Sequence, residues 1–144
     1  MSKQPTADET VNALFVEIRV LEGTFSELSA RQTLLERALV ESRAALDAIS
    51  GLGDKPQGEV LVQIGGGAML RSKPPSTDRV LVSVGAGVVL EKPKAEAVAL
   101  MEERVREVEK SLVSVAEQRN QVAERLDSDR QALNQLVESE RSGE

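Results

Sequence analysis

The sequence predicts an α+β fold, in which a long antiparallel α-helical coiled coil carries two central β-hairpins that contribute to an oligomeric β-barrel. Two long segments with apolar residues at alternating three- and four-residue spacing predict the coiled coil. A repeated segment between them predicts the hairpins, and only two of the 144 residues are aromatic, which disfavours a compact core. We therefore expect an N-terminal coiled-coil helix over 1–52, two β-hairpins as an oligomerisation platform over 53–92, and a C-terminal coiled-coil helix over 93–144.

The first helix is expected to begin at a capping box. Thr6 and Glu9 have the spacing at which each side chain bonds the other residue's backbone amide. Gly51 and Gly53, followed by Pro56, end the helix. At about 1.5 Å per residue, the helix from 7 to 50 is too long to fold back on a small core. Its seam, the row of positions that face the partner helix, has ten apolar residues and the polar Gln32 and Ser42. The twelve positions are Val11, Leu14, Ile18, Leu21, Phe25, Leu28, Gln32, Leu35, Leu39, Ser42, Leu46 and Ile49.

The repeated segment aligns residues 60–70 with residues 80–90, and six of the eleven positions are identical. Each copy has a β-branched run, a glycine turn and a second apolar run, which predicts a tight β-hairpin. Both faces of the first strands carry apolar residues and the hairpin edges are open, so we expect other subunits to complete a sheet or barrel. A loop with Pro74 and Pro75 separates the hairpins. The expected oligomer-interface residues are Val60, Leu61, Val62, Ile64, Met69, Leu70, Val80, Leu81, Val82, Val84, Val88 and Leu90.

The glycine clusters do not fit a phosphate-binding loop. Such loops need Gly-x-Gly-x-x-Gly opening into a helix, or Gly-Lys-Ser/Thr at their end. Leu90 stands where a third glycine is required after Gly85 and Gly87, and no Gly-Lys pair follows Gly65. The sequence therefore predicts no nucleotide cofactor.

The second helix is expected to start around Pro93, a residue suited to the first helical position. Its seam also has twelve positions, ten of them apolar: Val98, Met101, Val105, Val108, Leu112, Val115, Arg119, Val122, Leu126, Asp129, Leu133 and Leu136. Pairing Ile49 with Val98 and Val11 with Leu136 aligns every layer of an antiparallel coiled coil. A register shifted by one heptad remains an alternative.

Composition excludes several functional classes. The absence of His and Cys removes most zinc sites, thiol catalysis and disulfides, and we expect no catalytic residue, metal or cofactor. The net charge of −6 disfavours binding to nucleic acid. No apolar run approaches about 18 residues and no signal segment opens the chain, so we expect a cytoplasmic protein without membrane contact. Asp127 with Asp129 lacks the context of a calcium loop or an acid–base pair.

The order of helix, two hairpins and helix resembles the α-class subunit of prefoldin. The most specific likeness is the pair of glycine turns, over residues 64–68 and 82–88, followed by Glu91 and Lys92. The β class of that family has one hairpin, so the internal repeat assigns the α class. The resemblance implies a hexamer of two α and four β subunits whose coiled coils hold non-native polypeptides at their tips. It also implies ATP-independent delivery to a group II chaperonin.

Apolar residues outside the seam gather at the far end of the predicted coiled coil. Phe15, Val16, Val20 and Val137 lie off the seam there, whereas Leu34, Leu100 and Val113 are scattered surface residues elsewhere. Fraying of the helix ends would expose seam residues as well. The expected substrate-binding residues are Leu14, Phe15, Val16, Ile18, Leu21, Leu126, Leu133, Leu136 and Val137.

Two other classes remain as alternatives to a holding chaperone. The first is a structural coiled-coil assembly or filament-forming relative, whose hairpins associate without closing a ring. The second is an enzyme that works with carboxylates, Lys, Arg and Ser alone. The substrates, the division of binding between subunit classes, and the choice between an archaeal hexamer and a filament-forming or eukaryotic relative are not determined by the sequence.

Overall fold

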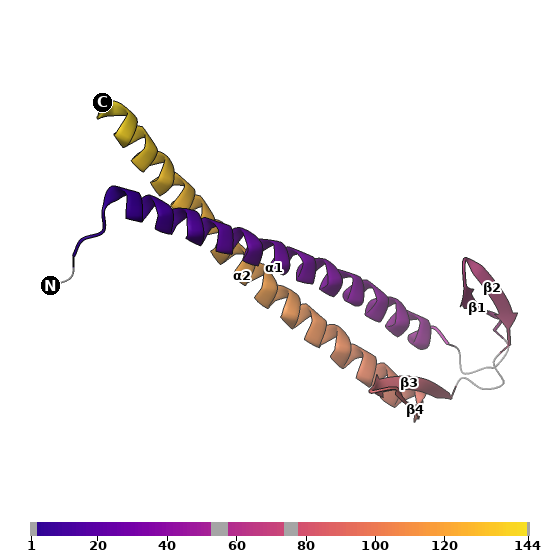
Figure 1. Cartoon of the computed structure of the whole chain (residues 1–144). Coiled ribbons are helices and arrows are strands. Elements are labelled where there is room, and N and C mark those ends of the chain that lie inside the picture. Colours follow the sequence, from indigo (N-terminus) through magenta and orange to yellow (C-terminus); the bar gives the residue numbers. More distant parts are fainter. Residues whose placement is uncertain (1–2, 53–57, 74–77, 144) are drawn as a thin grey trace. The chain divides into compact units, whose positions relative to one another are not determined.

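The computed structural model describes residues 3–52, 58–73 and 78–143. Its elements, in chain order, are α1 (Ala7–Ser50), β1 (Val60–Gly65), β2 (Ala68–Ser72), β3 (Arg79–Gly85), β4 (Val88–Pro93) and α2 (Lys94–Ser142) (Figure 1). The expected connector residues Gly53 and Pro56 and the loop residues Pro74 and Pro75 lie outside the described residues. The chain forms two compact units, one from residues 1–36 and 110–144 and the other from residues 37–109.

The beginning of α1 has the cap that the sequence predicts. The Thr6 amide donates to Glu9 Oε2 at 2.9 Å, and the Glu9 amide donates to Thr6 Oγ1 at 3.3 Å, so the capping box is confirmed. At the other end the Gly51 amide donates to the Asp47 carbonyl at 2.9 Å. These bonds satisfy backbone groups that a helix end would otherwise leave unpaired.

The two hairpins repeat one another in register as well as in sequence. β1 pairs antiparallel with β2, and β3 pairs antiparallel with β4, in two separate two-stranded sheets. Val62 pairs with Leu70 in the first hairpin, and Val82 pairs with Leu90 in the second. Identical residues therefore occupy equivalent positions, which confirms the prediction of tandem hairpins.

Glycine makes the hairpin turns possible. The two central residues of the first turn, Gly66 and Gly67, have φ values of 59° and 82°, and those of the second, Ala86 and Gly87, have values of 52° and 76°. Positive φ at both central positions is the geometry whose twist matches paired strands. Gly85, with φ at 107°, allows the register shift between β3 and β4.

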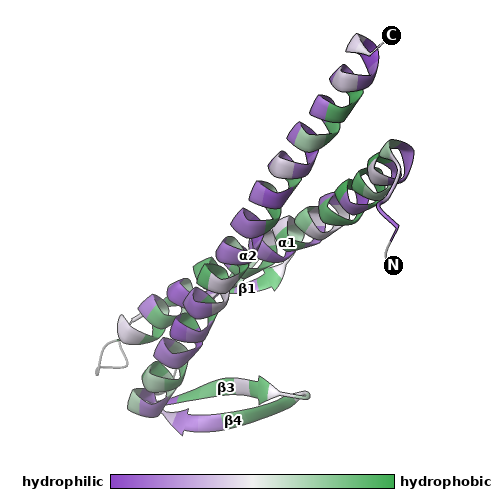
Figure 2. Cartoon of the chain, turned by 90° about the vertical axis from the view of Figure 1, so that its left-hand side faces the viewer, coloured by the Kyte–Doolittle hydropathy of each residue, from purple (hydrophilic) through white to green (hydrophobic). Residues whose placement is uncertain are grey.

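The second hairpin is fastened to the beginning of α2. The Lys94 amide donates to the Asp78 carbonyl at 2.8 Å, and the Arg104 guanidinium donates to the Ser83 carbonyl. Pro93 is the last residue of β4 and pairs with Arg79, so α2 begins one residue later than the sequence predicts. Strand pairing therefore extends up to the helix itself. In Figure 2 hydrophobic residues, in green, follow much of β3 and β4, and β4 becomes hydrophilic where it approaches α2.

In the unit made of residues 1–36 and 110–144, α1 and α2 lie side by side in opposite directions (Figure 1). Arg119 lies 4.8 Å from the centre of the Phe25 ring, and its Nη1 donates to Gln32 Oε1 at 3.2 Å. Phe25 and Gln32 are the seam positions on either side of Leu28, the residue that the predicted register places opposite Arg119. These contacts agree with that register. Ile18, Val115 and Leu126 are buried in the seam.

Neither helix, over the residues that the structure describes, has the long apolar stretch that crossing a bilayer requires.

Candidate functional site

We call the part of the first unit formed by residues 7–22 and 125–142 the tip. Three apolar side chains of α1 are exposed there, with exposed fractions of 55% for Phe15, 65% for Val16 and 62% for Val20. Single exposed apolar residues are common on proteins, but three within six residues of one helix form a patch. Hydrophobic contact with another molecule would remove this area from water.

The exposed residues surround a shallow hollow of about 730 Å³ on the surface of α1. Its lining residues are Asn12, Phe15, Val16, Ile18, Arg19, Val20 and Glu22. Three of these, Phe15, Val16 and Ile18, were expected from the sequence to bind substrate. Asn12, Arg19 and Glu22 were not expected, although their spacings of three, four and seven residues from Phe15 place them on the same helix face. The hollow is thus lined by both apolar and polar side chains.

The seam residues expected to bind substrate are less accessible. Ile18 and Leu126 are buried, with 9% and 5% exposed, because each faces the opposite helix. The remaining four are half-buried: Leu14, Leu21, Leu133 and Leu136. Ile18 also lines the hollow and the four half-buried side chains are partly accessible, but full contact between a ligand and all six side chains requires α1 and α2 to part at the tip.

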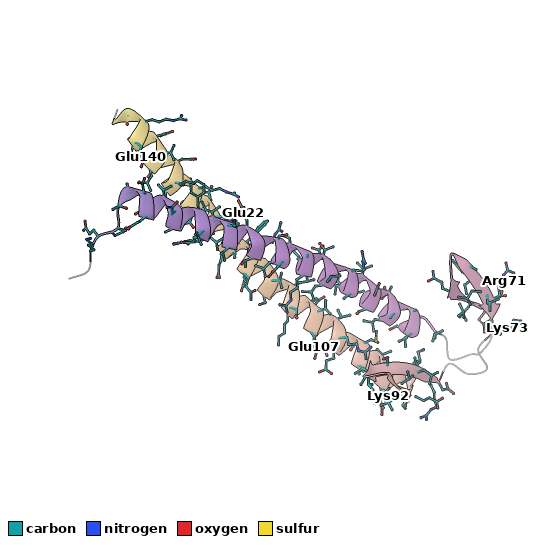
Figure 3. The ribbon with its side chains drawn as sticks, viewed as in Figure 1. Glu22, Arg71, Lys73, Lys92, Glu107 and Glu140 are labelled. Carbon is teal, nitrogen blue, oxygen red and sulfur yellow. The ribbon has the colours of Figure 1, made fainter. Side chains whose placement is uncertain are left out.

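Val137 lies on the same flank of the helix pair as Phe15. On this flank Arg130 Nη2 contacts Glu22 Oε1 at 2.9 Å (Glu22 is labelled in Figure 3). Phe15 precedes Glu22 by one heptad, and Val137 follows Arg130 by one heptad. The heptad pattern therefore places Phe15 opposite Val137, one heptad nearer the helix ends than the ion pair of Glu22 with Arg130. Val137 is 39% exposed.

The opposite flank of the tip carries a polar cluster. Arg125 Nε contacts Glu17 Oε1 at 2.6 Å and Asp129 Oδ1 at 3.3 Å. Asp129 is only 4% exposed, and its Oδ2 atom has no hydrogen-bond partner. Burial, and then the neighbouring carboxyl group of Glu17, raises the pKa of Asp129. The hydrogen bond from Arg125 lowers the pKa of Glu17.

The hairpins carry all twelve residues that the sequence assigned to an oligomer interface, and most of these side chains are exposed. Leu61, Ile64 and Leu81 are 63%, 62% and 71% exposed, and five further strand residues are between 43% and 57% exposed: Met69, Leu70, Val84, Val88 and Leu90. Val62 is 46% exposed, and Val60 and Val80 are half-buried.

Val82 differs from the other expected interface residues. It is 5% exposed within the single chain, so it has little area left for a partner. The adjacent Ser83 carbonyl accepts the bond from Arg104 of α2, and this bond ties β3 to the helix. The face of β3 that carries Val82 is therefore covered from within at Val82, whereas Val84 on the same face is 43% exposed. A smaller hollow of about 280 Å³ lies beside it, lined by Val84, Leu100, Glu103, Arg104 and Glu107.

The described ranges contain no group of three or more His, Cys, Asp or Glu side chains that could hold a metal ion. A family model described as "Prefoldin subunit" matches residues 21–139. The chain belongs to the prefoldin family.

Relatives within this family confirm the resemblance to the α class. "Prefoldin subunit alpha" of Nitrosopumilus maritimus is 30% identical over 133 residues, which cover 92% of each chain. The protein of the same name in Methanoregula boonei is 37% identical over 113 residues, which cover 73% of this chain and 74% of the relative. Prefoldin membership gives the chain a chaperone-type subunit role in general terms.

A solved structure supports the fold. The crystal structure of the prefoldin β subunit from Thermococcus strain KS-1 is similar with a TM-score of 0.62 and 18% sequence identity. The match covers 94% of this chain and 96% of the other. At this identity the likeness concerns only the α+β coiled-coil fold, with its long helices and small antiparallel β-structure.

Proposed function

We propose that this prefoldin-family chain is a subunit of an ATP-independent chaperone that holds non-native polypeptides at the tip. The observation that supports it best is the patch of Phe15, Val16 and Val20 around the hollow on α1. Unfolded chains present apolar side chains, and burying one such side chain fully is worth about 1.5–3 kcal/mol. A few contacts per tip bind weakly, whereas several tips on one platform act together through effective concentration.

The proposed platform is built by the hairpins. Exposed apolar residues on both hairpins need a partner surface, and each hairpin has open edges. The partners we propose are β-class prefoldin subunits, with two copies of this chain and four β subunits in a cytoplasmic hexamer. A group II chaperonin is the proposed recipient of the held polypeptide.

The decisive experiment replaces Phe15, Val16 and Val137 together by Ser. These residues lie off the seam, so we expect unchanged helicity, melting temperature and assembly mass, and weaker suppression of the aggregation of a chemically unfolded protein. The matched control replaces Leu34, Val40 and Val113 by Ser, since these residues are 65%, 68% and 60% exposed but do not line the hollow. Equal holding by the parent and both variants would place the client-binding surface elsewhere.

A nucleotide test completes the proposal. Neither glycine turn opens into a helix, and both return directly into a strand. Holding should therefore be the same with and without ATP and magnesium. Binding of ATP at about micromolar affinity in calorimetry, abolished by Gly65→Val or Gly85→Val, would contradict the proposal.

The exposed hairpin residues also fit a second function, that of a structural filament-forming assembly. The two candidates differ in how the hairpins associate: a filament grows from this chain alone, whereas the chaperone needs a single-hairpin partner. The native mass of the chain, measured alone and after mixing with a β-class subunit, distinguishes them. A defined mass only in the mixture supports the chaperone.

A further inference from the structure

We infer that the carboxylate of Asp129 loosens the pairing of α1 with α2 at the tip and so controls how readily the seam residues there reach a client. The inference rests on the proposed function, because it concerns the access of a client to the same tip. Asp129 is a positioning residue in this account, since it acts through the helix pair and does not itself touch the client.

The position of Asp129 makes its charge expensive to bury. It occupies a seam position of α2 with 4% of its surface exposed, and the predicted register places it opposite Ile18, which is also buried. The seam positions before and after it are Leu126 and Leu133. An ionised carboxylate in an apolar layer is costly unless hydrogen bonds and an opposite charge replace its water.

The groups around Asp129 supply only some of the hydrogen bonds and opposite charge that its carboxylate needs in place of water. From α2, Arg125 reaches Asp129 Oδ1 at 3.3 Å, but the same Nε atom lies closer to Glu17 Oε1 of α1, at 2.6 Å. Asp129 Oδ2 has no hydrogen-bond partner. On the other flank Glu22 and Arg130 pair with each other at 2.9 Å. One guanidinium therefore serves two carboxylates, and the cluster keeps a net negative charge.

Protonation of Asp129 would remove its buried, incompletely paired negative charge. A neutral Asp129 carries an O–H that can donate to Glu17, and it costs much less to bury. Since the pKa of Asp129 is raised in the paired helices, pairing is strongest at low pH and weakens as pH rises through that raised pKa. Glu17 acts in the opposite direction, but its pKa is lowered, so its contribution is lost only in more acidic solution. At pH values above the raised pKa of Asp129 the tip is therefore in its loosened condition.

The test measures the separation of the helices at the tip. The chain has no Cys, so Ala13→Cys and Gln135→Cys, at exposed positions of α1 and α2, accept spin labels selectively. In the assembled full-length protein we expect short, narrowly distributed label distances in acidic solution and longer, broader ones as the pH rises through the raised pKa of Asp129. Asp129→Asn and Asp129→Leu should give the short distances over the whole pH range.

Asp127→Asn is the matched control, because it removes the same charge from an exposed position two residues away. It should retain the pH response of the parent. The inference is overturned if Asp129→Asn and Asp129→Leu leave the distances as in the parent, or if Asp127→Asn shortens them equally.

A parallel holding assay, at a pH at which the labels of the parent show the loosened tip, links the tip to the client. Asp129→Leu and Asp129→Asn should hold a chemically unfolded protein several-fold less well than Asp127→Asn does. If the labels show closure while holding is unchanged, the seam does not serve the client and the inference fails. If the parent does not hold the unfolded protein at all, the proposed function fails, and the label distances still decide whether Asp129 loosens the tip.

Discussion

Gly85 and Gly23 show how the backbone conformation decides what a glycine contributes. Gly85 has a φ of 107°, which side-chain-bearing residues rarely adopt, whereas Gly23 lies inside α1. A Cβ atom added at either position would meet no atom within 4 Å. Crowding therefore plays no part at either site, and the two glycines differ only in the conformation that the backbone requires.

We predict opposite effects of alanine at these two positions. Gly85→Ala should lower the free energy of unfolding by about 1–3 kcal/mol, because alanine would be strained at this φ. Gly23→Ala should raise it by about 1 kcal/mol, because alanine favours the helix interior. Denaturant unfolding of the full chain, followed by circular dichroism, measures both changes. Shifts in the same direction would mean that backbone conformation does not govern these sites.

A second prediction at this scale concerns the two carboxyl groups of the polar cluster. Asp129 should titrate above the usual aspartate range, because it is buried beside Glu17, and Glu17 should titrate below the usual glutamate range, because Arg125 donates to it. Carbon-13 detected NMR of the side-chain carboxyl groups measures both titrations. In Arg125→Gln we expect the titration of Glu17 to return toward its usual range. Usual values for both groups in the parent would show that the cluster is not formed in solution.

At the scale of the elements, the helix pair is held by a seam that is apolar along most of its length and interrupted by polar layers. The predicted register places Leu46 opposite Met101, which is 8% exposed. Arg119 forms one polar layer, in which its guanidinium lies over the Phe25 ring and donates a hydrogen bond to Gln32. These contacts reduce the cost of placing a charge in the seam. In the unit that holds the hairpins the polar seam position is the uncharged Ser42, whereas the tip has a charged interruption at Asp129.

We predict that Leu46→Ser destabilises the helix pair itself. The substitution removes a half-buried leucine from the seam and should cost about 2 kcal/mol, at the low end of the range for core truncations. Leu34→Ser, at a position that is 65% exposed, should change the free energy of unfolding by less than about 0.5 kcal/mol. Thermal melts of both variants test the difference. Similar melting temperatures would show that Leu46 is not part of the seam.

The seam and the hairpins could be predicted from the sequence, whereas several contacts between the elements could not. Three- and four-residue spacing found the seam, and a repeated glycine turn found both hairpins, because these features depend on local periodicity. The burial of Val82 and the sharing of Arg125 between Glu17 and Asp129 depend on contacts between segments distant in sequence. The hollow around Phe15 was only partly predicted. Its lining residues Asn12, Arg19 and Glu22 are polar, so a search for exposed apolar residues does not find them.

At the scale of the whole molecule, the hairpins present apolar area that the chain does not cover. Leu81 is 71% exposed, whereas its neighbour Val82 is 5% exposed, so the two faces of β3 have different roles. Val82 packs within the chain, and Leu81 on the other face is open to a partner. Assembly and local folding can therefore be separated by substitutions at adjacent positions.

We predict that Leu81→Asp prevents assembly without unfolding the chain. A charge on the open face would be buried unpaired in any subunit interface. Sedimentation should show a smaller particle with unchanged helicity, and Leu61→Asp should behave alike. Val82→Asp should instead loosen the second hairpin from α2, seen as faster hydrogen exchange of β3 amides. An unchanged oligomer in both Leu61→Asp and Leu81→Asp would exclude the hairpins as the assembly surface.

The order in which a ribosome releases the chain gives the antiparallel helix pair a direction of growth. Arg125 follows its contact partner Glu17 by 108 residues, whereas Glu109 follows its partner Arg43 by only 66. Closing the shorter loop costs less entropy, and its second half also leaves the ribosome earlier. Pairing should therefore begin beside the hairpins and reach the tip last. Until translation passes Leu126, Ile18 of the newly synthesised α1 remains exposed to solvent. The growing chain then resembles the non-native polypeptides that the finished protein is proposed to hold.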